Sequence, residues 1–239
     1  MAKELSKASV EGLGLEKQYA ERLETLRFFG ILGKRGEAKA GDAPVPTFKE
    51  VARVFTPAML DVAATFKKPT LLLIPETSFA AKVRALDTHK TPLVENECHL
   101  NVVFRRSDPG SETIAGWRVL IAEGAEEVDP KPDDDLDQVL IERIAARKAA
   151  RIKNPDGSVL ERGMDCHAYI LLMMESLRKG RPIDRKGWTL LDDDASLSDT
   201  RMPGANWVAG EGQVAFHADH EFLRRIEARF RSAVGGEVG

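Results

Sequence analysis

The segment from residue 203 to residue 234 carries the pattern that most constrains how this chain can fold. It begins with prolines and glycines, which are typical of turns, and over residues 213–217 apolar side chains alternate with small or polar ones. Because successive side chains of a strand point to opposite faces, the alternation predicts a strand with one buried and one exposed side. Four side chains of the segment are expected to face inward: Val214, Phe216, Phe230 and Val234.

A second interpretation of the same segment stays open. Phe222, Ile226 and Phe230 are spaced four residues apart, which is also the spacing of the apolar face of a short amphipathic helix. The two interpretations place different side chains on the surface, so the backbone of this part decides between them.

The composition is that of an ordinary globular protein: 239 residues, 43% hydrophobic, 31% charged, with a net charge of −3. This near balance of charge disfavours a nucleic-acid-binding protein, which usually presents a basic face. No apolar run approaches the roughly 20 residues of a membrane-spanning helix. The first residues lack the apolar core of a signal peptide. We therefore expect a cytoplasmic protein, and display on a surface through a partner would also fit these features.

The N-terminal part, residues 1–100, is expected to be mainly helical. An amphipathic helix is predicted over residues 15–29, with Gly30 ending it in a left-handed conformation. Thr47 and Glu50 have the spacing of a capping box, in which each side chain bonds to the backbone of the other.

Further along this part, Thr56 followed by Pro57 predicts a second helix start. Residues 70–74 form a continuous apolar run that ends at a proline, which predicts a buried strand. Thr77 is then expected to cap a helix that continues to about Leu86.

In the C-terminal part, residues 101–239, strands are predicted over 117–122 and 188–191, and a helix over 165–179 with Asp165 as its cap. Two further elements are expected: a strand over 98–104 and a helix that begins near Leu136. Because helices and short strands do not alternate regularly, the order disfavours a doubly wound parallel sheet and favours an α+β fold. No linker is long enough to force a split, so we expect one domain over residues 1–239.

The residues His217, Ala218, Asp219 and His220 form the combination most suggestive of a metal site. Two histidines three apart could hold a divalent ion if the backbone were helical, but a strand would separate the two rings. The sequence places no third ligand, so we expect neither a metal nor a cofactor.

Motifs of catalysis are missing from the sequence. It has no Gly-Lys-Ser/Thr phosphate loop, no GxSxG and no HExxH. Cys98 and Cys166 form no CxxC pair, and Cys166 lies in an apolar helical stripe, which favours a buried thiol. His167 flanks the same stripe and is expected to be structural. We therefore expect no enzymatic activity.

Several runs, taken in order, resemble the variable proteins of diversity-generating retroelements, which have a C-type-lectin fold of the formylglycine-generating-enzyme type. The runs near the C-terminus are 176–184, 187–189, 201–207, 212–216 and 229–234. The upstream runs are 68–75, 85–87 and 116–119. The order of the runs, more than any one of them, carries the resemblance.

The resemblance implies a C-type-lectin-like fold with short antiparallel strands, a loop-rich C-terminal part, a variable region near 204–230, and additional N-terminal helices. It also implies a receptor-like protein in which templated mutagenesis rewrites exposed codons while the core stays constant. The ligand would be macromolecular, with protein as the expected class. The implied binding positions are Ala215, His217, Ala218, Asp219, His220, Leu223 and Arg225.

Two alternatives remain at this point. One is an enzyme of the formylglycine-generating or sulfatase-modifying type on the same fold, which would need a reactive cysteine pair or a metal near the C-terminal surface. The other is an interaction protein of the same fold whose surface does not vary.

Overall fold

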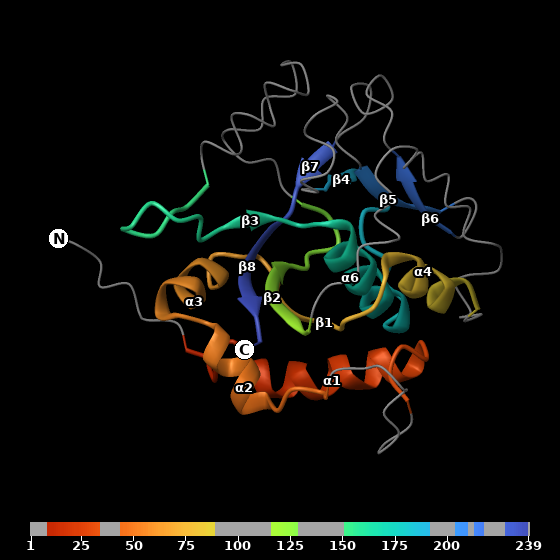
Figure 1. The fold of residues 1–239 in the computed structure, drawn as a ribbon. Helices are drawn as coiled ribbons and strands as arrows, with labels where there is room; N and C mark the ends of the chain where they lie inside the picture. Colours follow the sequence, from red (N-terminus) through yellow and green to blue (C-terminus); the bar gives the residue numbers. More distant parts are fainter. Residues whose placement is uncertain are drawn as a thin grey trace.

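The computed structural model describes residues 9–33, 44–88, 116–128, 151–191, 204–209, 213–217 and 228–238. Within these ranges the chain is an α+β fold with two four-stranded sheets and five helices (Figure 1). The α+β class expected from the order of elements is therefore confirmed.

The first sheet has the strand order β1-β2-β8-β3, and all neighbouring strands are antiparallel. Its strands are β1 (Pro69–Ile74), β2 (Arg118–Glu123), β8 (Ser232–Glu237) and β3 (Arg162–Gly163). Residues 71–74 of β1 and 119–122 of β2 are apolar and at most 2% exposed, because both faces of the sheet are covered. In β8, Gly235 has φ 146°, and a Cβ there would lie 2.1 Å from the Val119 carbonyl oxygen, so the position requires glycine.

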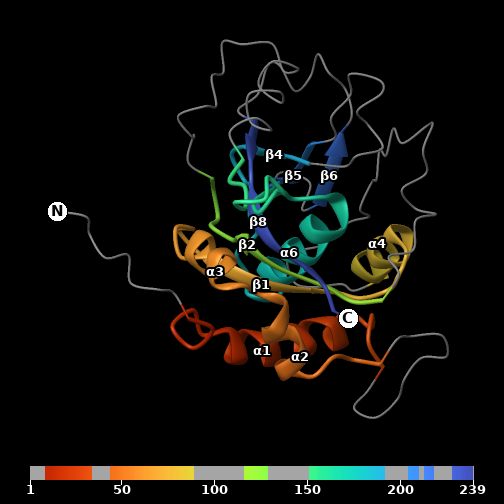
Figure 2. The same ribbon diagram turned by 60° about the vertical axis from the view of Figure 1, so that its left-hand side comes forward.

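Five helices are described: α1 (Leu15–Phe28), α2 (Phe48–Val54), α3 (Pro57–Ala63), α4 (Phe79–Thr88) and α6 (Cys166–Arg178). In both views α1 lies below the first sheet, while the second sheet lies at the opposite end of the molecule (Figures 1 and 2). Residues 166–177 of α6 are all buried, because this helix packs against β1, α1 and α4.

α1 covers the free edge of β1 with polar side chains. Gln18 Oε1 accepts from the Leu71 amide at 2.8 Å, and Gln18 Nε2 donates to the Pro69 carbonyl at 3.2 Å. Arg22 Nε donates to the Leu71 carbonyl at 2.7 Å. These contacts satisfy an edge that would otherwise present unpaired backbone groups.

The second sheet has the order β6-β5-β4-β7. Its strands are β4 (Trp188–Leu190), β5 (Gly204–Val208), β6 (Gln213–His217) and β7 (Ala228–Phe230). β4 with β5 and β5 with β6 are antiparallel, as expected, whereas β4 and β7 are parallel. The chain between β4 and β7 is long enough to bring β7 back in the same direction, which a short hairpin cannot do.

The local signals for helix ends are largely confirmed. Thr47 and Glu50 form the capping box, and Thr56 Oγ1 accepts from the Met59 amide at 3.3 Å. Asp165 caps α6, and Gly30 has φ 68° after α1. The expected cap of α4 was wrong by one residue, because Ser78, and not Thr77, accepts from the Ala81 amide at 3.2 Å.

Side chains from both ends of the chain meet in a single buried cluster. The cluster includes Leu15 and Leu26 of α1, Leu72 of β1, Tyr169 of α6 and Val234 of β8. The N-terminal helices therefore pack on the core to which the C-terminal strands also contribute. The elements expected over 98–104 and from Leu136 lie outside the described residues.

Candidate functional site

The β5–β6 hairpin has one buried and one partly exposed side. The register pairs Ala205 with Phe216, Asn206 with Ala215, and Trp207 with Val214. The side chains that face inward are at most 5% exposed: Ala205, Trp207, Val214 and Phe216. Asn206 and Ala215, between them, are partly exposed. The alternation predicted for residues 213–217 is therefore confirmed where side chains are described.

Aromatic rings hold the inner side of β6 in place. The Phe216 ring makes edge-to-face contacts with Phe79 of α4, at a centroid distance of 5.3 Å, and with Tyr169 of α6, at 5.8 Å. Such arrangements are the preferred geometry of aromatic pairs. The strand is thus anchored to two helices through a side chain that is 1% exposed.

Arg231 connects the two sheets. It is the single residue between β7 and β8, and it is completely buried. Its Nη1 donates to the carbonyl of Glu123, the last residue of β2, at 2.9 Å and to that of Ala125, two residues later, at 2.8 Å. Its Nε donates to Thr189 Oγ1 of β4 at 2.9 Å. Hydrogen bonds from one buried guanidinium therefore join the first sheet to the second.

Asp184 is the counter-ion of Arg231. Its carboxylate accepts from Arg231 Nη2 and, at 2.6 Å, from Thr189 Oγ1. Its backbone has φ 53°, and its carbonyl accepts from the Trp207 amide of β5 at 3.1 Å. Burial, and then the nearby Asp184 charge, raise the pKa of the Tyr169 phenol well above its usual value. We call Arg231, Asp184 and Thr189 the inter-sheet cluster.

Two of the predicted binding positions, Ala215 and His217, belong to β6. Ala215 lies on the partly exposed side of β6, and His217 is the last residue of that strand. The remaining positions lie outside the described residues: Ala218, Asp219, His220, Leu223 and Arg225. The helix interpretation of the segment is wrong for Phe230, which lies in strand β7, while Phe222 and Ile226 fall outside the described ranges.

Sequence reasoning missed Asn206 as a surface position. It lies opposite Ala215 in β5, and its Oδ1 is a buried atom that accepts no hydrogen bond from the described residues. Leaving such an acceptor without a donor costs about 1–3 kcal/mol. The alternation Ala205, Asn206, Trp207 was the signal that could have identified it.

A buried polar cluster lies between α4 and α6. Lys82, with no exposed surface, donates to the Thr77 carbonyl at 2.6 Å and lies 3.1 Å from His167 Nδ1. Burial lowers the pKa of Lys82 to about 7. Burial and the neighbouring Lys82 lower the pKa of His167 to about 4. Cys166, next in sequence to His167, is 1% exposed.

The expected burial of Cys166 is thus confirmed, and His167 beside it is buried as well. In the described part of the chain, no three His, Cys, Asp or Glu side chains gather in a way that could hold a metal ion. None of the helices described there is long and apolar enough to cross a membrane.

No family model, no curated protein and no solved structure matches this chain.

Proposed function

We propose that this protein is a ligand-binding protein of the variable type, with a C-type-lectin-like fold. Its macromolecule-binding surface is centred on the outward side of β5 and β6 and continues into the chain that follows β6. The observation that supports this proposal is the division of β6 into anchors, Val214 and Phe216, and an outward position, Ala215.

A surface that changes needs a framework that does not depend on the changing residues. The inter-sheet cluster provides this, since Arg231, Asp184 and Thr189 lie inside the protein and hold β4, β5 and the end of β2 together. Phe216 is fixed separately by Phe79 and Tyr169. Substitutions on the outward side therefore leave these contacts intact.

The position of Cys166 does not favour the enzymatic alternative. An enzyme of the formylglycine-generating type would need a cysteine that substrate can reach, and Cys166 is 1% exposed within α6. No described residue favours this alternative over the binding protein.

Sequencing the same locus in sister strains tests the proposal. We expect substitutions to concentrate at the predicted binding positions, such as Ala215, His217 and Asp219, while Val214 and Phe216 stay constant. In the purified protein, Ala215→Ser should change the free energy of unfolding by less than about 0.5 kcal/mol, whereas Phe216→Ala should lower it by about 3–5 kcal/mol. Substitutions spread evenly over the gene, with no constant anchors, would contradict the proposal.

A further inference from the structure

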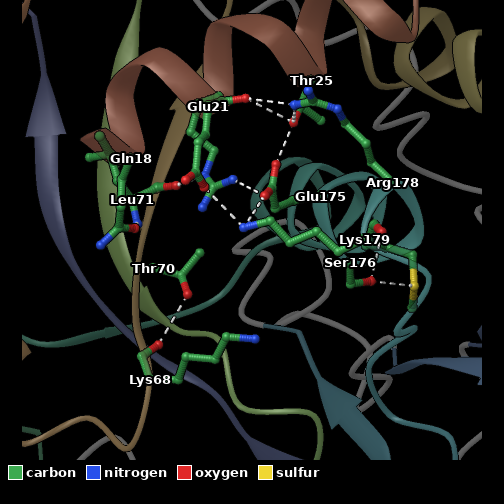
Figure 3. Close-up of polar contacts among 12 residues, drawn as sticks. Gln18, Glu21, Thr25, Lys68, Thr70, Leu71, Glu175, Ser176, Arg178 and Lys179 are labelled. Atoms are coloured by element: carbon green, nitrogen blue, oxygen red, sulfur yellow. Dashed lines mark hydrogen bonds and ion pairs between the residues drawn. The ribbon is translucent and has the colours of Figure 1, made fainter. Parts of the chain in front are cut away.

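A second candidate site lies at the C-terminal end of α6 (Figure 3). It is a cavity of about 300 Å³ between α1, α6 and the adjoining ends of β1 and β2. This volume is at the low end of the roughly 300–1,000 Å³ of small-molecule sites. The cavity is large enough for a compact metabolite, and the side chains that line it determine which chemical class of metabolite can bind.

The wall is rich in positive charge. Four basic side chains line the cavity: Arg22, Lys68, Lys179 and Arg181. Among the described residues that line it, Glu175 is the only acidic one. Figure 3 shows Lys68 and Thr70 on one side and Glu175, Ser176 and Lys179 of the α6 end on the other.

Two of the four cations are already neutralised. Glu175 forms ion pairs with Arg22 and, at 2.7 Å, with Lys179, which also pairs with Glu21 at 3.0 Å. Burial alone would raise the pKa of Glu175, but its partners, led by Arg22, hold that pKa below its ordinary value. The Glu175 carboxylate is therefore ionised at neutral pH and fixes Arg22 and Lys179 in place.

The other two cations have no acidic partner in the part of the chain that the structure describes. Lys68 and Arg181 are exposed, and neither pairs with an acidic group among the described residues. Arg22 is 6% exposed, its Nε donates to the Leu71 carbonyl, and its Nη1 pairs with Glu175. The cavity thus combines two cations that have no acidic partner among the described residues with two that Glu175 holds in place.

We propose that this cavity binds the phosphate group of a small phosphorylated molecule. A phosphomonoester carries a charge of about −1.5 to −2 at pH 7, which matches the two unpaired cations. Arginine and lysine are the side chains that recognise phosphate oxygens, and hydrogen bonds of this charge-assisted kind are stronger than neutral ones. The site is separate from the proposed macromolecule-binding surface and does not depend on it.

Calorimetric titration of the full chain with glycerol 3-phosphate tests the proposal, with glycerol as the neutral control and sodium chloride at matched ionic strength. We expect a dissociation constant of about 1 mM or lower for glycerol 3-phosphate and no binding of glycerol. The double variant Lys68→Gln/Arg181→Gln should bind about 10-fold or more weakly. Both side chains are exposed, so the variant should fold normally, which its melting temperature without ligand checks.

The matched control is Lys17→Gln/Arg53→Gln, which removes the same charge from exposed positions that do not line the cavity. It should bind like the wild type. Inorganic phosphate binding as tightly as glycerol 3-phosphate would support the site and assign it to the free ion. Equal weakening in both double variants, no saturable binding by the wild type, or succinate binding as tightly as the phosphate compounds would overturn the proposal.

Discussion

At the scale of single residues, His167 shows how burial controls charge. Its pKa in the folded protein is about 4, against an ordinary value of 6.5, because burial and Lys82 both disfavour the protonated ring. As the pH falls from about 6.5 to 4, the unfolded state takes up a proton before the folded state does. The contribution of this residue to stability is therefore present above pH 6.5 and is lost as the pH falls through this range.

The variant His167→Gln measures this effect, since glutamine can still accept from Lys82 and does not titrate. We expect urea unfolding of the wild type to lose stability between pH 7 and pH 5 more steeply than the variant does, by up to about 1.4 kcal/mol per pH unit. Subtracting the pH dependence of the variant's stability from that of the wild type removes the contribution of the carboxylates, which both proteins share. Parallel pH profiles would show that His167 does not have the lowered pKa.

At the scale of the elements, α1 acts as a cover for the edge of β1. Replacing Gln18 by alanine leaves the Leu71 amide and the Pro69 carbonyl without their side-chain partners. We expect a loss of about 1–3 kcal/mol in the free energy of unfolding and faster hydrogen exchange at the Leu71 amide. Lys17→Ala, one residue earlier on the exposed side of α1, should leave both unchanged. Unaltered exchange at Leu71 in Gln18→Ala would mean that the edge is protected in another way.

Elements with local signals were predictable from the sequence. The capping box at Thr47, the cap at Asp165 and the apolar run of β1 each depend on residues close together in the chain. The two-residue β3 and the three-residue β7 have no such signal, because they are defined by pairing with β8 and β4. The inter-sheet cluster and the cavity also have no local signal in the sequence, because their members are distant from one another along the chain. Asp184 and Arg231, for example, are 47 residues apart.

At the scale of the whole molecule, Arg231 makes the two sheets dependent on each other. Its guanidinium bonds to the end of β2, to β4 and to Asp184, and no water reaches it to replace a lost partner. Arg231→Met leaves the Asp184 carboxylate buried without its counter-ion, and removing one partner of a buried pair costs roughly 3–5 kcal/mol. We expect the free energy of unfolding to fall by this amount in Arg231→Met. Arg185→Met, at the exposed neighbour of Asp184, should cost less than about 0.5 kcal/mol.

Loss of the Arg231 contacts should also allow the second sheet to unfold before the helices and the first sheet. Two of the three tryptophans, Trp188 and Trp207, lie in the second sheet, so their fluorescence follows that sheet, while far-UV circular dichroism follows the helices packed on the first. In the wild type the two transitions should coincide, because Arg231 ties the sheets together. In Arg231→Met the fluorescence transition should come at a lower denaturant concentration. If the two transitions still coincide, contacts such as Phe216 with Tyr169 suffice to couple the sheets, and the framework beneath the proposed binding surface does not depend on Arg231.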